Sequence, residues 1–439
     1  MACANSSRAD CPASTSWCAT WSDAVETTAL PCDLDALGDA QQFALYGRTW
    51  SLNDPEFQHA LARAHQTGDR PRCLCTPAGL DMYVARHQRY RVKRLPDSGP
   101  QHHPTCPSYE PDGACSGLGP LVGDAVRDAG SDRVELRVDF PWVRLQGRAV
   151  PPGPPGERGE VANPRARMSL RAVLHYLFER AGFNRWTPAM AGKRHQGVLH
   201  KYLMEVAAGI AVKGVPLADR LYVPERFDER RMAEVAVRRS EKLAITHPQD
   251  GCAPMALMVG DFKCCEPGDL ARRLWIRHMP DLPLLLAPQG WQRLVRVHRP
   301  LLEAHDADGG RRLRLVVAAL VRAHRSLGFE IDTACLMLTS RDWIPLEGLS
   351  ELTLVEALVA QQRRFFKPLR YDAPTAALFA NALLLDAGPR PVALHLLSAF
   401  MPAPDRVAKE HLVQADTGSA WVWSVEQSMP QFPLPAALR

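Results

Sequence analysis

The stretch CLCTPAGLDMYVARHQRYRVKRLPDSGPQHHPTC, residues 73–106, decides the fold of the chain around it. Its potential metal ligands are Cys73, Cys75, His102, His103 and Cys106. Three thiolates and one imidazole make a tetrahedral set of the kind that closes a structural zinc site. We therefore predict a structural zinc ion held by the three cysteines and one of the two histidines, of which His103 is preferred.

The residues between the two groups of ligands predict a β-hairpin. Residues 82–86 and 90–95 are rich in β-forming residues and partly alternate, and residues 87–89 form the turn. Turn residues also stand beside both groups of ligands, at 76–79 and 96–100. This arrangement is typical of a zinc ribbon. The alternative is a set of unliganded thiols, because free cysteine often behaves as a small buried apolar residue.

Composition and charge set wide limits on function. The chain has 439 residues, a formal net charge of +5 and the composition of an ordinary globular protein. A mildly basic charge permits contact with nucleic acid without requiring it. We expect no membrane span, because no apolar run is long enough, and no signal peptide. Twelve cysteines without an export signal predict a reducing, cytoplasmic location.

The pattern predicts a mixed α/β (α+β) protein of several domains. A helix should begin near Asn53 and end at Gly68, and the apolar run 313–323 predicts another helix. Residues 133–150 should add strands to the first domain. The expected parts are a disordered tail (1–45), a zinc-binding β domain (46–150), a Pro/Gly linker (151–165), a helical winged-helix-like domain (166–250), an α/β segment (251–345) and a nuclease-like α/β domain (346–432).

The middle of the chain offers candidate nucleic-acid contacts. Two helices, 168–181 and 198–212, precede an extended segment, an order that resembles a winged helix. Lys193, Arg194 and Lys201 would lie on and before the second helix and contact phosphates. The alternative is a solvated basic face. Further along, Arg273, Trp275 and Arg277 alternate in a way that suits base stacking and phosphate contact, or simply an exposed sheet face.

The last hundred residues predict a helix with Glu351, a strand ending at Asp386, a strand with His395, a segment with Arg406 and Lys409, and a final strand at 421–425. This order resembles the restriction-endonuclease-like PD-(D/E)XK core. The resemblance implies carboxylates that hold Mg²⁺ and a lysine that orients water. Glu351 and Asp386 fit the two acidic positions, so they and His395 are the candidate catalytic residues.

The third motif of that core departs from the family pattern. Its Glu-x-Lys positions read His395-Leu396-Leu397, so both charged groups are missing and the site looks catalytically degraded. The alternative is a generic α/β domain in which Asp386 begins a turn at the end of a strand.

Several stretches are similar to the bacterial family known as domain of unknown function 1173. They are RCLC, GLDMYVAR, KRLPDSGPQHHPTCPSYEPDGACSGLG, LHYLFERAGFNRWTP, RLYVPERFD and FFKPLRYDAP, within about residues 45–432. The resemblance implies three shared cysteines, matching Cys73, Cys75 and Cys106, and an association with integrative and conjugative elements. It implies no activity.

These observations lead to three hypotheses of function. The first is a zinc-binding protein that binds nucleic acid, expected to be DNA of a mobile element. The second is a divergent Mg²⁺-dependent nuclease of the PD-(D/E)XK type. The third is a zinc-dependent scaffold for protein interaction. Sequence specificity, protein partners and oligomeric state have no signal in the sequence.

Overall fold

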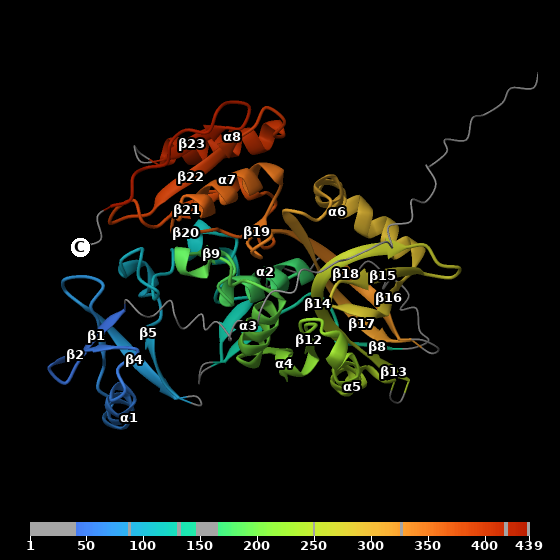
Figure 1. The fold of residues 1–439 in the computed structure, drawn as a ribbon, viewed down its shortest axis with the longest axis horizontal. Coiled ribbons are helices and arrows are strands. Elements are labelled where there is room, and N and C mark those ends of the chain that lie inside the picture. The colour runs from blue at the N-terminus through green and yellow to red at the C-terminus, as the bar shows by residue number, and fades with distance from the viewer. Residues whose placement is uncertain are drawn as a thin grey trace, which may run out of the picture. The chain divides into compact units, whose positions relative to one another are not determined.

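The computed structural model describes residues 41–86, 89–129, 133–145, 166–248, 251–324, 328–416 and 420–436. The predicted Pro/Gly linker lies outside these residues, as does the predicted tail up to residue 40. The described part is a mixed α/β structure with several sheets, as expected from the sequence (Figure 1). Within it, no helix has the length and apolar character needed to cross a membrane.

The first sheet is antiparallel and carries the predicted hairpin. Its strands, in spatial order, are β2 (Arg48–Ser51), β1 (Gln42–Leu45), β3 (Arg72–Cys73), β4 (Leu80–Arg86) and β5 (Tyr90–Arg94). Helix α1 (Phe57–Thr67) packs on β4 and β5. It buries Phe57, Leu61 and Ala64 and ends at Gly68, whose left-handed conformation (φ 78°) suits glycine. The predicted hairpin and helix are confirmed, but the helix begins at Phe57 and not near Asn53. The tail prediction was wrong for residues 42–45, because β1 pairs with both β2 and β3.

The strands predicted within 133–150 form but pair outside the first sheet. A small sheet has the order β11 (Val215–Pro216), β10 (Ile210–Val212), β7 (Val134–Leu136) and β6 (Val126–Asp128). Strand β8 (Val143–Leu145) pairs with β13 (Cys252–Pro254). The second predicted helix is also shorter than expected, because α3 (Gln196–Ala208) ends at Gly209 and residues 210–212 become β10. These pairings join strands from both sides of the predicted linker, so they do not follow the predicted domains.

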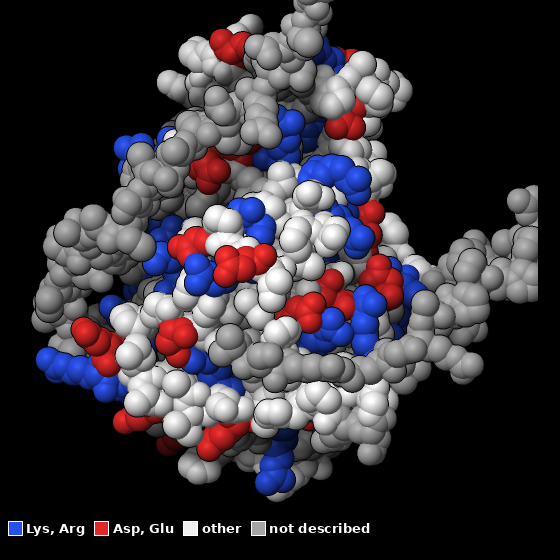
Figure 2. Space-filling view, turned by 90° about the vertical axis from the view of Figure 1, so that its right-hand side faces the viewer, with Lys and Arg blue, Asp and Glu red and all other residues white. Residues whose placement is uncertain are grey.

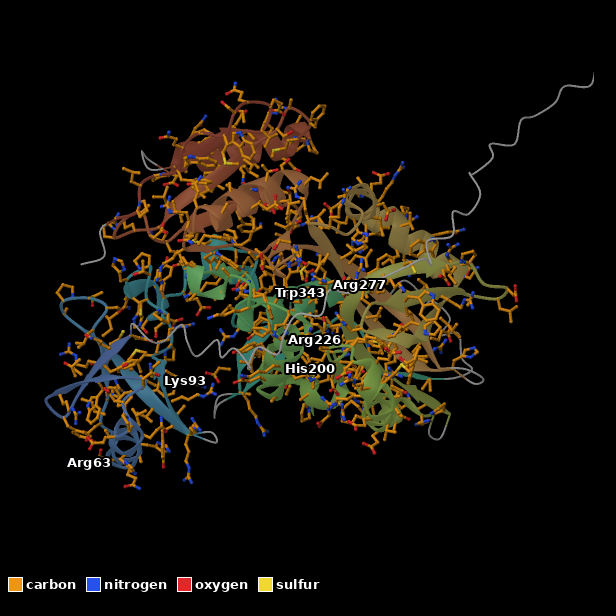
Figure 3. All side chains as sticks on the ribbon, viewed as in Figure 1. Arg63, Lys93, His200, Arg226, Arg277 and Trp343 are labelled. Atoms are coloured by element: carbon orange, nitrogen blue, oxygen red, sulfur yellow. The ribbon has the colours of Figure 1, made fainter. Side chains whose placement is uncertain are left out.

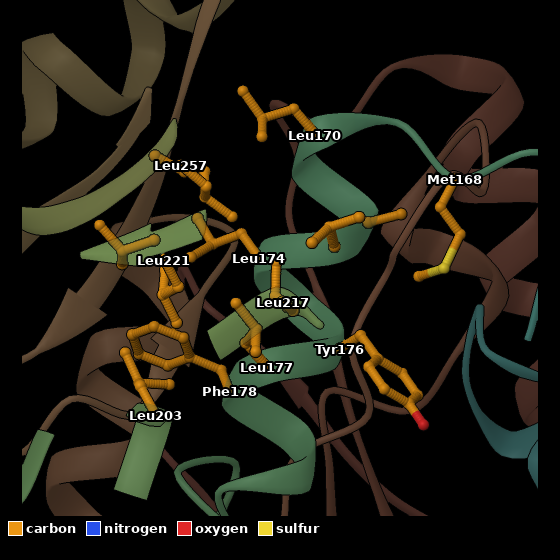
Figure 4. Packing of buried hydrophobic residues seen from close by; sticks show 14 of the residues in the cluster. Met168, Leu170, Leu174, Tyr176, Leu177, Phe178, Leu203, Leu217, Leu221 and Leu257 are labelled. Atoms are coloured by element: carbon orange, nitrogen blue, oxygen red, sulfur yellow. The ribbon is translucent and has the colours of Figure 1, made fainter. Parts of the chain in front are cut away.

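Four further elements accompany these strands. They are α2 (Leu170–Arg180), α4 (Leu217–Arg220), β12 (Leu221–Tyr222) and α5 (Met232–Leu243). Helix α2 is apolar on most of its sides, and eight of its eleven residues are therefore buried. Figure 4 shows Leu174 and Leu177 of α2 packed toward Leu217, Leu221 and Leu257. This core joins the middle helices to the largest sheet.

The largest sheet closes on itself. Its ring is formed by β14 (Ala256–Glu266), β15 (Arg272–Ile276), β16 (Met279–Leu286), β18 (Phe329–Ser340) and β17 (Leu313–Ala323), which pairs back with β14. Helix α6 (Pro288–Asp308) connects β16 to β17, and β12 and β19 (Pro345–Leu346) add at the edges. The strands of this barrel can be followed in Figure 1.

The helix predicted at 313–323 was wrong, because these residues form strand β17. The strand lies between β14 and β18 and is buried on both faces. Both faces of such a strand are apolar, so the alternation that normally marks a strand is missing.

The last sheet has the order β23 (Trp421–Ser424), β22 (Val392–Leu397), β21 (Ala382–Leu384), β20 (Phe365–Phe366) and β9 (Arg185–Trp186). Helices α7 (Leu349–Ala360) and α8 (Ala403–Ala415) precede β20 and β23. β20, β21 and β22 are antiparallel in turn, and β22 is parallel to β23. The predicted helix containing Glu351, the two following strands and the last strand are confirmed as elements.

Candidate metal centre

The predicted ligands lie on turns at the ends of strands. Cys73 ends β3, and Cys75 follows just before a turn closed by the hydrogen bond from Gly79 N to Thr76 O (2.9 Å). The second group follows β5 and a short 3₁₀ helix, Gly99–Gln101. Because β3 and β4 are paired and β4 leads into β5, the hairpin brings the two groups together.

Four side chains converge in one group: Cys73, Cys75, His102 and Cys106. Their ligand atoms all lie within 4.8 Å of one another. The sulfurs of Cys73 and Cys106 are 3.8 Å apart, and His102 Nδ1 is 3.2 Å from Cys75 Sγ and 3.8 Å from Cys106 Sγ. Two sulfurs bound at about 2.3 Å to one tetrahedral zinc ion would stand about 3.8 Å apart. The group could hold a metal ion, and its donors and spacing suit zinc.

The histidine in this group is His102, so the preference for His103 is corrected. His102 is buried and turns Nδ1 toward the thiols, while its Nε2 is buried without a hydrogen-bond partner. His103 turns back on its own loop, where Nδ1 lies 2.8 Å from Thr105 Oγ1. His102 follows the 3₁₀ helix in an extended conformation (φ −70°, ψ 154°). The two neighbouring histidines therefore point in different directions.

Hydrogen-bond donors surround the sulfurs. Gln41 Nε2 lies 3.3 Å from Cys73 Sγ and 3.6 Å from Cys106 Sγ, and the backbone N–H of Ser108 lies 3.4 Å from Cys106 Sγ. Such donors favour the thiolate form that a metal requires. Gln41 was missed in the sequence because it is far from both groups of ligands, and only the pairing of β1 with β3 brings it near.

Electrostatics also favour a cation at this place. Hydrogen bonds with Cys106 and Cys75 hold the pKa of Cys73 well below its usual range. The pKa of Cys106 is raised because its thiol hydrogen-bonds with Cys73 and Cys75, so a second thiolate beside the first is disfavoured. Burial opposes the imidazolium of His102, but hydrogen bonds with Cys73 and Cys75 raise its pKa to about 9. A divalent cation would relieve this crowding of ionisable groups.

Four protein ligands leave no open position for a substrate, which is the pattern of a structural rather than a catalytic zinc site. Cys73 and Cys106 belong to a core that also contains Phe366, Leu383 and Leu385 of the last sheet. Arg185 of β9 donates to the carbonyl oxygen of Tyr109, just after the ligand loop. An ion at this site would therefore fix the contact between the first and last sheets.

The predicted nucleic-acid residues do not form one surface. Arg194 is buried, and its guanidinium donates to the carbonyl oxygens of Phe183 (3.0 Å) and Gly182 (3.0 Å). Burial lowers its pKa to about 9. Arg194 is thus a structural residue whose one unpaired donor, Nε, is buried away from solvent and phosphate, and its prediction is corrected. Lys193 is half-buried and Lys201 is exposed, so their role stays a prediction.

The predicted catalytic residues do not form a metal-binding group. Within the described residues, the cysteine–histidine tetrad is the one group of three or more metal-binding side chains. Asp386 is bound by Arg363, at 2.7 Å, and by the backbone N–H of Arg364, at 2.8 Å. Glu351 forms a buried ion pair with Lys367 at 2.8 Å. His395 is buried with neither ring nitrogen hydrogen-bonded, and burial followed by the charge of Lys409 lowers its pKa to about 4.

A buried polar cluster replaces the expected triad. Asn381 Nδ2 donates to Glu351 Oε1 at 2.8 Å, and Asn381 Oδ1 accepts from the backbone N–H of Leu396. Lys409 of α8 is buried close to Glu351 and His395, donates to the carbonyl oxygen of Phe379, and has a pKa lowered by burial to about 8. Asn381 and Lys367 were missed, and Lys409 was not connected with Glu351, because only the fold brings these residues together.

Comparison with curated proteins finds no match, and neither does comparison with solved structures. One family model covers most of the chain, including the cysteine–histidine tetrad, the barrel and the last sheet. On this match, over residues 43–426, the chain belongs to the family described as protein of unknown function, DUF1173.

Proposed function

We propose that this protein is a zinc-binding protein that binds nucleic acid, with DNA as the expected ligand. The observation that carries the proposal is the buried tetrad, whose four ligand atoms lie within 4.8 Å of one another. Cys73, Cys75 and Cys106 are free thiols and form no disulfide. This supports a reducing, cytoplasmic setting in which the thiolates remain available to zinc.

The mildly basic charge of the chain permits nucleic acid as a ligand. The net charge is +5, and on the face in Figure 2 Lys and Arg side chains are interspersed with Asp and Glu. A mixed surface of this kind suits binding at a few placed arginines rather than over one large basic field. The proposal includes an association with a conjugative element, whose DNA would be the ligand.

A nuclease-like fold without nuclease activity is the second part of the proposal. The order α7, β20, β21, β22, α8, β23 supports the resemblance to the PD-(D/E)XK core, and Glu351 stands on its first helix. The pairing of Glu351 with Lys367, and of Asp386 with Arg363, argues against Mg²⁺ binding. We infer that this domain contributes to binding and not to cleavage.

The test is metal content and DNA binding measured on the same samples. We expect one zinc per chain, lost in Cys106→Ser and in His102→Ala but kept in His103→Ala, the matched control. We also expect salt-dependent DNA binding. A metal-free wild-type protein would overturn the zinc site. Failure to bind any nucleic acid at low salt would overturn the function, and a protein partner kept after nuclease treatment would then favour the scaffold hypothesis.

A further inference from the structure

We propose that the outer face of strand β15 in the barrel binds single-stranded nucleic acid, with a base on Trp275 and phosphates on the arginines beside it. This inference rests on the proposed function and assigns it a site and a class of ligand. Neither the metal centre nor the last sheet contributes residues to this site.

The connectivity of the barrel is the first observation. β14, β15 and β16 form an antiparallel meander, α6 follows, and β17 and β18 complete the ring, with β18 parallel to β16 and β17 paired with β14. This is the strand order of the oligonucleotide/oligosaccharide-binding fold, which binds single strands across its second and third strands. Here those strands are β15 and β16. Because a fold alone does not establish function, the side chains must carry the argument.

The alternation along β15 gives the barrel two different faces. Leu274 and Ile276 point into the apolar interior of the barrel. Arg273 and Trp275, which alternate with them, therefore point outward, and Arg277 follows directly after the strand, where it pairs with Asp261. Arg273 is exposed and the other two are half-exposed. In this stripe of three residues, the aromatic ring of Trp275 thus stands between two cations along the chain. An unpaired base can stack on such a ring while the neighbouring phosphates meet the arginines.

The far end of this stripe is a built cationic site. Asp261 of β14 is completely buried, and its Oδ2 lies 3.3 Å from Arg277 Nε and 2.9 Å from Arg314 Nη1. The guanidinium of Arg314 also lies over the ring of Trp343, at 4.6 Å. One buried carboxylate thus orients two half-exposed arginines and leaves a net positive charge.

A third arginine extends this site toward solvent. Arg226 is exposed and makes no ion pair or hydrogen bond within the described residues. Its neighbour Phe227 donates its backbone N–H to His278 Nδ1 at 3.3 Å, which places this segment at the turn after β15. Burial, followed by the charges of Arg314, Arg277 and Arg226, lowers the pKa of His278 to about 4. Figure 3 shows the labelled Arg226, Arg277 and Trp343 in one region of the molecule. A guanidinium without a partner beside two oriented ones is suited to a phosphodiester.

Two carboxylates near the stripe are already engaged. Glu266 accepts the hydrogen bond of Trp275 Nε1 at 2.9 Å and lies 3.9 Å from Arg273. Asp281 of β16 is paired with Arg239. Glu266 fixes the plane of the indole, so Trp275 presents its ring in one orientation. Because the ring is already fixed, stacking of a base on it loses less conformational entropy.

The experiment measures binding of a fluorescent oligothymidylate and of a blunt DNA duplex of matched length by the full-length, zinc-loaded protein. We expect the single strand to bind more tightly than the duplex. Trp275→Ala should weaken single-strand binding between about 5-fold and about 150-fold, and Trp275→Phe by less than about 5-fold. The phenylalanine variant keeps an aromatic face but loses the bond to Glu266, so it separates stacking from a structural role.

Charge variants test the arginines independently of folding. Arg273→Gln and Arg226→Gln should each reduce the magnitude of the log–log salt slope by about 0.7. The control is Arg293→Gln on α6, an exposed arginine without a partner within the described residues, which should leave binding unchanged. Binding by the wild type that survives Trp275→Ala, Arg273→Gln and Arg226→Gln, or a preference for duplex, would overturn this site while leaving the proposed function intact. No binding of either DNA by the wild type would overturn the proposed function itself.

Discussion

Glu351→Gln distinguishes a structural carboxylate from a catalytic one. Glu351 is buried in α7 and pairs with the buried Lys367 at 2.8 Å. Its oxygens also accept from Asn381 Nδ2 and from the backbone N–H of Glu347. Glutamine keeps the shape of the side chain but removes its charge. The ammonium of Lys367 would then lie buried without a counterion, near a second buried ammonium on Lys409.

The expected effect is large and destabilising. Removing one partner of a buried ion pair costs about 3–5 kcal/mol, because the other charge stays buried and unpaired. The matched control is Glu356→Gln in the same helix, where the carboxylate pairs with Arg312 at the surface. An exposed pair contributes no more than about 1 kcal/mol. The two identical substitutions should therefore differ by at least about 2 kcal/mol in the free energy of unfolding.

Urea unfolding followed by circular dichroism measures this difference, and the double variant Glu351→Gln/Lys367→Met tests its cause. Methionine removes the unpaired ammonium, so the double variant should regain most of the lost stability. A catalytic carboxylate behaves in the opposite way, because replacing it commonly leaves stability unchanged or raised. Undiminished stability in Glu351→Gln, together with loss of an Mg²⁺-dependent cleavage, would refute the structural assignment and restore the nuclease hypothesis.

Two further predictions concern buried groups. His175 accepts a hydrogen bond from Tyr371 N, and burial, followed by nearby cations such as Arg171, lowers its pKa to about 3. The unfolded chain therefore takes up a proton on His175 below about pH 6.5 that the folded protein does not, so this residue alone lowers stability by about 2 kcal/mol at pH 5. The loss of unfolding free energy between pH 7 and pH 5, measured by urea unfolding, should be smaller by about this amount in His175→Gln. The Arg194→Gln variant should lose at least about 3 kcal/mol of unfolding free energy, because several buried carbonyl groups lose their hydrogen-bond donor. The control Lys193→Gln should lose almost none. A fully folded Arg194→Gln variant with reduced DNA affinity would contradict the structural role.

Local patterns in the sequence were sufficient for much of the fold. The spacing of Phe57, Leu61 and Ala64, with Gly68 after them, fixes α1 because a helix places these residues on one face and glycine ends it. The thiols Cys73, Cys75 and Cys106 could be found for a related reason. Metal ligands lie at turns on either side of a hairpin, and turns carry local signals.

Choices that depend on tertiary contacts could not be made from the sequence. His102 and His103 are adjacent, and only the exit of the 3₁₀ helix decides which ring meets the thiols. Residues 313–323 became a strand because β14 and β18 flank them on both sides. Asp386, after β21, fitted the acidic position of the nuclease pattern. The residue that contacts Glu351 is instead Asn381, which directly precedes the same strand.

The position of the metal centre limits what its removal can show about function. In β20, Phe365 faces the core that fills the barrel and Phe366 faces the core that contains Cys73 and Cys106. In β21, Leu384 belongs to the first core and Leu383 to the second, as does Leu385 directly after the strand. The β20–β21 pair therefore packs against both cores, and we expect loosening of one core on zinc removal to disturb the other. Loss of DNA binding on zinc removal would follow even if no ligand of the ion touched DNA. Only substitutions on the solvent face, such as those at Trp275 and Arg226, can locate the binding surface, because they leave both cores intact.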